Sequence, residues 1–405
     1  MAVFSNHHRG ADTFTSPRLK DLLEEFSRVA QLFDEVFVVI DALDEYSTTY
    51  REDFFHTLSV FGPSVRVFIT SRPEYEITRR LHRYPHIILE PPRHGRDLEA
   101  FVKTFIQRSR LAFLLSSKAE EEKIVTGICE KSGGLFILAS LQLQMISKLK
   151  SFKDIQEGLA SLPQSLDDYY HRILENTTNQ VSTLSDQITK VISWIYRAKR
   201  PLLVSELLKA IAVTVDGDNL GTLLGENSRE ILAMILDRCS GLVVIDEERS
   251  VIRFAHFSVQ EFLQPGTFKL PGECEIANTC LTFLTLGDSI RGLCKSDRAL
   301  DDKLSKYPFL EYAARYWGAH GKDCTNPTFS SLAVKLLCHE GYLVSAIQVM
   351  DYTDYHSNCY PYNYSKVFTR KLSGLHIVAS FGLDQLLESV IENSHAEINE
   401  VDDQG

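Results

Sequence analysis

Two short apolar runs, each ending in polar residues, stand out in the first ninety residues. The first is VFVVI at residues 36–40, followed by DALDE at 41–45; the second is VRVFI at 65–69, followed by TSRP at 70–73. Runs without polar alternation are typical of parallel strands buried on both faces. The helical periodicity of residues 52–60 between them predicts a strand–helix–strand unit.

Flanking segments extend this unit. An apolar face at helical spacing runs from Leu19 to Phe33 behind Ser16 and Pro17, which predicts a capped helix. Residues 74–82 predict a further helix, and Ile87–Leu89 a short strand. We therefore expect residues 1–95 to form part of an α/β sheet domain.

The middle of the chain has only helical periodicity, and a plain helical bundle is its simplest interpretation. Residues 96–178 predict four helices without an intervening strand. These helices are expected at 97–110, 117–131, 135–149 and 163–176.

Residues 179–265 predict three helices followed by a β-hairpin, which is the element order of a winged helix. The apolar runs at 241–245 and 251–254 flank the turn Asp246–Arg249 and supply the hairpin. The helices are expected at 184–200, 204–213 and 230–239.

The remainder predicts helices joined by polar loops. Residues 266–365 form a helical connector, with helices at 273–286, 307–318 and 329–348 and a polar linker at 351–366. Residues 366–405 predict a helix-turn-helix followed by a turn. The expected fold class is therefore α/β in the first part and mainly α in the rest.

Composition limits the classes of function. The 405 residues are 44% hydrophobic and 24% charged, which is typical of a globular chain, and the net charge is −11. An acidic chain disfavours diffuse binding to nucleic acid or to an anionic membrane, so neither is expected as a partner. Without an N-terminal apolar signal segment, we expect a cytoplasmic protein with eight reduced cysteines and no zinc site.

The polar ends of the two predicted strands carry a candidate chemistry. An aspartate at a strand end can hold a magnesium-bound water, a nearby acid can order an attacking water, and an arginine on the next strand can meet a γ-phosphate. Asp41, Asp44, Glu45 and Arg72 supply these groups. For an isolated DxxDE pattern, simple helix capping is the alternative interpretation.

VFVVIDALDE followed by VRVFITSRP resembles the Walker B and sensor-1 strands of NACHT-type signalling NTPases of the STAND class, in the fungal branch often described as nephrocystin-like. The resemblance implies a P-loop NTPase sheet with ATP or ADP and Mg²⁺ as cofactors. Asp41 would be the magnesium ligand, Asp44 and Glu45 the catalytic or water-ordering acids, and Arg72 the phosphate sensor.

The phosphate-binding motif of such a sheet is missing from these residues. A P-loop requires GxxxxGK[ST], and the Gly-Lys pair of the chain, Gly321-Lys322, is followed by Asp323 far downstream. We therefore expect either a fragment that begins inside the NTPase domain or a lineage that has lost its nucleotide site. The isolated chain is expected to bind no cofactor.

RFAHFSVQEFL and RPLLVSELLKAIAV resemble the winged helix found beside GPI-inositol-deacylase-type NTPase domains. The resemblance implies that His256 contacts the β-phosphate of bound ADP; the alternative is a structural histidine that caps the following helix. A winged helix also suggests DNA binding. Residues 184–265, however, carry 9 Lys and Arg against 11 Asp and Glu, which disfavours contact with a phosphate backbone.

Two further segments resemble the same class of protein. KSGGLFILASLQLQMI and LPQSLDDYYHRIL resemble the lid helices of the NTPase domain, and SGLHIVASFG resembles the opening of an ankyrin repeat. The implied partners are proteins, bound through ankyrin repeats and through oligomerisation of the NTPase core. Our hypothesis is a non-catalytic interaction module of a NACHT-ankyrin switch. The alternatives are an NTP-hydrolysing switch completed by a P-loop from elsewhere and a DNA-binding protein.

Overall fold

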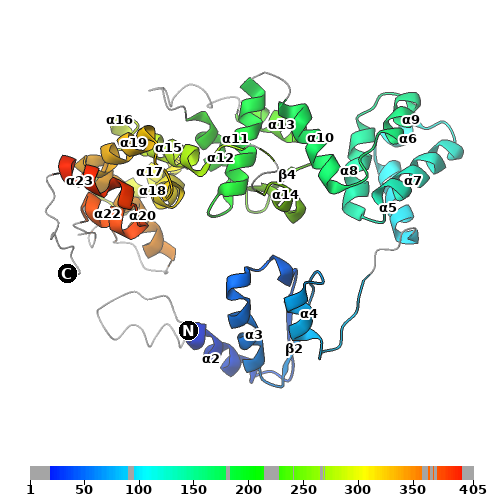
Figure 1. Cartoon of the computed structure of the whole chain (residues 1–405), viewed down its shortest axis with the longest axis horizontal. Coiled ribbons are helices and arrows are strands. Elements are labelled where there is room, and N and C mark those ends of the chain that lie inside the picture. Colours follow the sequence, from blue (N-terminus) through cyan, green and yellow to red (C-terminus); the bar gives the residue numbers. More distant parts are fainter. Residues whose placement is uncertain are drawn as a thin grey trace. The chain divides into compact units, whose positions relative to one another are not determined.

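The structure is a computed structural model of the 405-residue chain, coloured along the sequence in Figure 1. The chain divides into two compact units, residues 1–90 and 91–405, and each is described by itself. The finer boundaries expected at residues 178, 265 and 365 stay predictions. The described residues are 19–89, 95–178, 183–213, 228–239, 241–264, 268, 270–357, 364, 368 and 372–394.

The first unit contains the predicted strand–helix–strand. Strands β1 (Val36–Ile40) and β2 (Val65–Ile69) pair in parallel from Val36 opposite Val65 to Ile40 opposite Ile69. The crossover contains helix α3 (Arg51–Val60) and the single turns η2 (Leu43–Glu45) and η3 (Thr48–Tyr50). Helices α2 (Leu19–Ala30) and α4 (Tyr75–Leu81) flank the strands in sequence.

The strand expected at Ile87–Leu89 is wrong. These residues have no strand partner among the described residues, and their exposed fractions are 86%, 76% and 88%. A strand exists only where a neighbouring edge offers free backbone groups. The apolar sequence alone could not supply that edge.

The second unit opens with helices that bury a separate core. It is formed by α5 (Arg96–Arg108), α7 (Lys118–Ser132), α8 (Phe136–Ser147) and α9 (Phe152–Ala160). Within residues 95–178, the sequence did not predict α9 or the short α6 (Leu111–Leu114). The fully buried members of this core include Val102, Ile106, Leu111, Ile124, Ile128, Leu143, Ile146 and Ile155.

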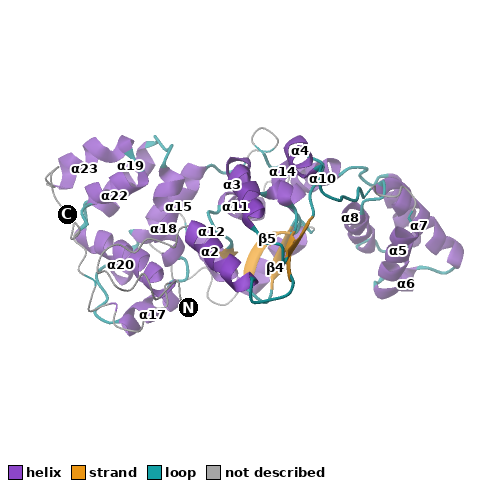
Figure 2. Cartoon of the chain, turned by 90° about the horizontal axis from the view of Figure 1, so that it is seen from below, coloured by secondary structure: helices purple, strands orange, loops and turns teal. Residues whose placement is uncertain are grey.

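A winged helix follows after α10 (Leu166–Thr178). Helices α11 (Thr183–Arg197), α12 (Val204–Ala212) and α13 (Ser228–Arg238) precede the hairpin of β4 (Val243–Asp246) and β5 (Val251–Phe254). The short β3 (Leu202–Leu203) pairs with β5, so the sheet order is β3-β5-β4, all antiparallel. Figure 2 labels β4 and β5, the two strands of the hairpin. The next helix is α14 (Phe257–Phe262).

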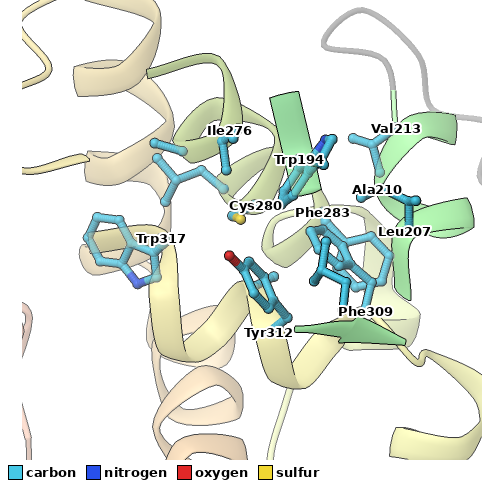
Figure 3. Packing of buried hydrophobic residues seen from close by; sticks show 14 of the residues in the cluster. Trp194, Leu207, Ala210, Val213, Ile276, Cys280, Phe283, Phe309, Tyr312 and Trp317 are labelled. Carbon is cyan, nitrogen blue, oxygen red and sulfur yellow. The ribbon is translucent and has the colours of Figure 1, made fainter. Parts of the chain in front are cut away.

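The connector is built around α15 (Glu273–Leu284) and α18 (Leu310–Gly321), with α16 (Gly287–Ile290) and α17 (Asp297–Lys306) between them. Trp194 of α11 packs edge-on against Phe309 and Tyr312, with ring centroids 5.4 Å and 5.8 Å apart. Figure 3 shows this aromatic cluster, in which Phe283 also takes part. The winged helix and the connector therefore share one core.

Two expectations for the connector need correction. The helix expected at 329–348 is two helices, α19 (Pro327–Leu337) and α20 (Glu340–Ser357), and α20 enters the segment expected to be a linker. Within that segment, Tyr364 is also buried, and its backbone N–H donates to Asp297. No single helix of the described residues is long and apolar enough to cross a membrane; α19 with Glu340–Tyr352 passes that test only as a pair bent by 86°.

The C-terminal hairpin consists of α22 (Gly374–Phe381), η4 (Asp384–Leu386) and α23 (Leu387–Ser394). Two glycines permit its close packing: a Cβ on Gly318 would lie 2.3 Å from the Phe381 ring, and one on Gly374 would lie 2.7 Å from the Leu337 carbonyl oxygen. The helical pair agrees with the expected helix-turn-helix. The ankyrin assignment stays a prediction, and residues 395–405 lie outside the described residues.

The expectation of eight reduced cysteines is wrong, because Cys274 and Cys324 form a disulfide. The bond joins the start of α15 to the turn that follows α18 and closes a 50-residue separation. Cross-linking a loop of this length lowers the conformational entropy of the unfolded chain. In the chain-entropy model this stabilises the fold by about 4 kcal/mol. Cys129, Cys239, Cys280, Cys294 and Cys338 are free, and Cys359 lies outside the described residues.

A polar network lies beside the disulfide. Buried His320 is bonded through Nδ1 to the Glu273 carboxylate, and its Nε2 lies 2.9 Å from the Tyr312 hydroxyl. Lys199 Nζ lies 3.2 Å from Glu273 Oε1. Burial lowers the pKa of His320, and Glu273 only partly opposes that change. Burial raises the pKa of Glu273, but the hydrogen bond from His320 and the charges of His320 and Lys199 outweigh burial. The pKa of Glu273 is therefore lowered.

We predict that the second unit loses stability on acidification, starting near the ordinary histidine pKa of 6.5. Below that value the unfolded chain binds a proton that folded His320 does not bind, and below 4.5 Glu273 acts in the same direction. We expect His320 to contribute on the order of 1 kcal/mol to this loss of unfolding free energy, and His320→Gln should remove that contribution. The contribution is small because Glu273 is 38% exposed, so water screens its interaction with His320.

Urea unfolding followed by tryptophan fluorescence measures this effect, because Trp194 and Trp317 are the two tryptophans of the chain. The matched control is His339→Gln, a half-buried histidine of the same unit. In His320→Gln, the free energy of unfolding should fall less between pH 7 and pH 5 than in the unmodified chain. In His339→Gln, it should fall as much as in the unmodified chain. An unchanged slope in His320→Gln would contradict the prediction.

Candidate functional site

The candidate site lies at the C-terminal ends of β1 and β2, where Thr70 joins the two strands. Its hydroxyl donates to the Asp41 carboxylate and accepts the Ala42 backbone N–H at 2.9 Å. The Leu43 N–H donates to the Thr70 carbonyl at 2.9 Å. Ala42 adopts a left-handed conformation with φ 52°, which turns the chain sharply after the strand. Asp41 is thereby oriented while it stays exposed.

Asp44 and Arg72, which the sequence assigns to different roles, pair with each other. Asp44 Oδ1 accepts the Arg72 backbone N–H at 2.9 Å, and Asp44 Oδ2 lies 3.3 Å from Arg72 Nε. The Asp44 side chain is 6% exposed, whereas that of Arg72 is 49% exposed. Both carboxylate oxygens of Asp44 therefore have a partner.

A buried arginine holds the loop behind this pair. The Arg51 side chain is 3% exposed and donates to the carbonyls of Asp44 at 2.6 Å and Tyr46 at 2.9 Å. Its remaining nitrogen donates to Glu74 at 2.5 Å. A guanidinium offers five donors in a fixed plane, so one side chain can fix the loop after β1 and the segment after β2 together.

The described residues do not by themselves fit a resident Mg²⁺. Magnesium in proteins takes one or two carboxylates together with substrate phosphates and water. Asp44 is engaged by Arg72, which leaves Asp41 and exposed Glu45. Within the described part of the chain, no group of three His, Cys, Asp or Glu is placed to hold a metal. The magnesium role of Asp41 stays a prediction.

His256 lies in the second unit and is described by itself. It is the N-cap of α14, where Nδ1 accepts the Ser258 backbone N–H at 3.1 Å. The Ser258 hydroxyl lies 2.7 Å from His256 Nδ1 and 2.7 Å from the Tyr170 hydroxyl, so the cap is tied to α10. This is the capping role that the sequence left open. The contact with ADP stays a prediction.

Comparisons with known proteins match two separate parts of the chain. Residues 2–72 match the family described as "Nephrocystin 3, N-terminal", and residues 175–269 match "GPI inositol-deacylase, winged helix domain". Both matches agree with the resemblances that the sequence shows to nephrocystin-like proteins and to the GPI-inositol-deacylase winged helix.

One fungal relative gives a longer match. The "Azaphilone pigments biosynthesis cluster protein L" of Monascus ruber is 28% identical over 183 residues, which cover 40% of this chain. The match spans 36% of the length of that curated relative. No solved structure matches this chain.

Two residues of the site were missed by sequence reasoning. Thr70 lies in the quoted TSRP segment, and its place at a strand end, level with Asp41, was a signal that could have identified it. Arg51 gave no such signal, because a single arginine at a helix start normally remains in water. Only the fold shows that it is buried.

We predict that Arg51→Met lowers the local stability of the first unit by about 2–3 kcal/mol. Two loop carbonyls then lose a charged donor, although the methionine retains most of the buried volume. Hydrogen exchange followed by mass spectrometry should show faster exchange in residues 36–46. The control is Arg66→Met, whose exposed pair with Glu35 at 3.5 Å contributes little. Equal exchange in the two variants would contradict the prediction.

Proposed function

We propose that this chain is an interaction and regulatory module of a NACHT-type switch whose nucleotide site does not hydrolyse NTP. The observation that carries the proposal is the pairing of Asp44 with Arg72 through two contacts of 2.9 Å and 3.3 Å. A water-ordering acid needs a carboxylate oxygen that is open to water, and a phosphate sensor needs a guanidinium that faces the phosphate. In this arrangement the two groups neutralise each other.

The Arg51 contacts support this proposal. Arg51 binds the Asp44 carbonyl, so moving Asp44 toward a bound water would disturb a charge-assisted hydrogen bond of 2.6 Å. The loop is therefore held in the paired state from both the backbone and the side chain. A loop that is fixed in this way favours a structural role for this end of the sheet over catalytic turnover.

The proposed partners of the chain are other proteins, and the proposed compartment is the cytoplasm. The C-terminal hairpin, α22 to α23, lies where the sequence resembles an ankyrin repeat, and such repeats act as stacked protein-binding surfaces. In the first unit, Phe37, Val39 and Phe68 are exposed on β1 and β2. Parallel strands are normally covered on both faces, so further protein packed on the sheet would complete it.

A second candidate function is an active NTPase whose P-loop comes from elsewhere. It is favoured by Asp41, which Thr70 orients at the strand end, and by the exposed carboxylate of Glu45. In this hypothesis Asp41 would hold a magnesium-bound nucleotide and Glu45 would order the attacking water. Arg72 would then have to leave Asp44 when a γ-phosphate arrives.

We predict that titration of the full chain with Mg-ATP or Mg-ADP gives no saturable heat at micromolar ligand concentrations. The phosphates have no P-loop in this sequence to hold them, and Asp44 is already paired. Micromolar binding that is abolished by Asp41→Ala and retained by Asp34→Ala would overturn the proposal in favour of the active NTPase. Asp34 is an exposed acid that precedes the opposite end of β1, which makes it the matched control.

We also predict that the chain does not shift duplex DNA in a gel at low salt. Its winged-helix region carries a net negative charge, and phosphate contacts dominate non-specific affinity. A shift that weakens steeply with added salt would contradict this prediction and favour the DNA-binding hypothesis.

A further inference from the structure

The Cys274–Cys324 disulfide joins two segments that are held by different parts of the second unit. Cys274 follows the turn at Pro271, whose carbonyl accepts from Ser193 Oγ and from Arg197 Nε, each at 2.8 Å. Both donors lie on α11 of the winged helix. The Cys274 side of the bond is therefore attached to the winged helix.

The Cys324 side is attached to the C-terminal hairpin. Gln385 of η4 donates through Nε2 to the carbonyls of Gly321 at 3.0 Å, Lys322 at 3.1 Å and Cys324 at 3.4 Å. These carbonyls belong to the end of α18 and the turn that follows it. The disulfide thus lies between the turn bound by the winged helix and the turn bound by the hairpin.

The surroundings of the bond also suit the reduced state. Cys274 is half-buried and Cys324 is 1% exposed, so Cys274 is the more accessible end of the bond. The Cys324 sulfur lies 3.5 Å from the His320 carbonyl oxygen. A thiol formed at Cys324 would therefore have an acceptor already in place. Neither state requires a new partner for the buried sulfur.

We propose that Cys274–Cys324 is a reversible thiol-exchange site that sets how tightly the winged helix is coupled to the C-terminal hairpin. Its reactants are dithiols, either small molecules or redox proteins. This inference goes beyond the proposed function and does not depend on it.

The exchange proceeds in two balanced steps. A thiolate of the dithiol attacks Cys274 Sγ, the Cys274–Cys324 bond breaks, and Cys324 takes up a proton as the thiol. The second thiolate of the reductant then attacks the mixed disulfide and releases Cys274, which is protonated in turn. The protein gains two electrons and two protons, and the dithiol is oxidised to its disulfide.

After reduction, the Glu273–His320 pair remains as the link between the same two segments. Glu273 precedes Cys274, and His320 lies one helical turn before Cys324. Lys199 and Arg197 face the pair from the winged helix, and Tyr312 faces it from α18. The covalent link and the polar link are therefore in parallel, and each should hide the loss of the other.

The test uses the full chain, oxidised or treated with dithiothreitol under native conditions. Alkylation and mass spectrometry should count two additional thiols after treatment. Hydrogen exchange should rise about tenfold or more in α11 and in α22–α23, since their linked turns are no longer covalently joined. The variant with Cys274→Ser and Cys324→Ser should exchange like the reduced protein and should not respond to dithiothreitol.

Cys338→Ser is the matched control, because Cys338 is a half-buried free cysteine of the same unit; it should respond like the unmodified chain. His320→Gln should raise exchange in the reduced protein by a larger factor than in the oxidised protein. If the double serine variant does not fold, dithiothreitol treatment of the unmodified chain provides the same comparison. A bond that resists dithiothreitol in the folded chain, or reduction without a change in exchange, would overturn the proposal.

Discussion

Trp194 packs edge-on against Phe309 and Tyr312, and this contact makes the winged helix and the connector one folded body. All three side chains are nearly or fully buried, and truncating such an aromatic in a core costs about 3–5 kcal/mol. The Tyr312 hydroxyl also accepts the Lys199 backbone N–H at 3.0 Å, and the Arg200 guanidinium lies 5.4 Å from the Tyr312 ring centroid. Arg200 is paired with Glu206 at 2.7 Å, and Lys199 with Glu273 at 3.2 Å. The polar network thus shares Tyr312 with the aromatic contact.

The spacing of apolar residues predicted the elements whose limits follow from local sequence. It missed the elements whose limits depend on tertiary contacts. The strands β1 and β2 and the helices and hairpin of the winged helix follow directly from apolar spacing. Residues 329–348 show why the rest could not be predicted: their apolar spacing is almost continuous, yet α19 ends at Leu337 and α20 leaves at 86°. Tyr364 also lies in a polar segment, yet its ring is buried against Tyr352 and Phe368, whose ring centroids lie 5.1 Å and 5.6 Å away.

The site was predictable in position but not in its pairing. Strand-end residues had to meet because parallel strands bring their C-terminal ends to one edge of the sheet, and Asp41 does contact Thr70 there. Whether Asp44 points to a ligand or to Arg72 depends on the loop backbone. That backbone is set by the left-handed Ala42 and by buried Arg51. Neither the left-handed conformation of Ala42 nor the burial of Arg51 can be read from the sequence.

The pairing of Asp44 with Arg72 also limits how the first unit could respond to a nucleotide. An incoming γ-phosphate could attract the Arg72 guanidinium, which is 49% exposed, but the Arg72 backbone N–H would still bind Asp44 Oδ1. Asp44 would then keep one bond to Arg72 and, through its carbonyl, one to Arg51. Freeing Asp44 for catalysis would therefore require movement of the backbone after β2 as well as a side-chain rotation. A resting state held this firmly favours a structural role for Asp44 over a catalytic one.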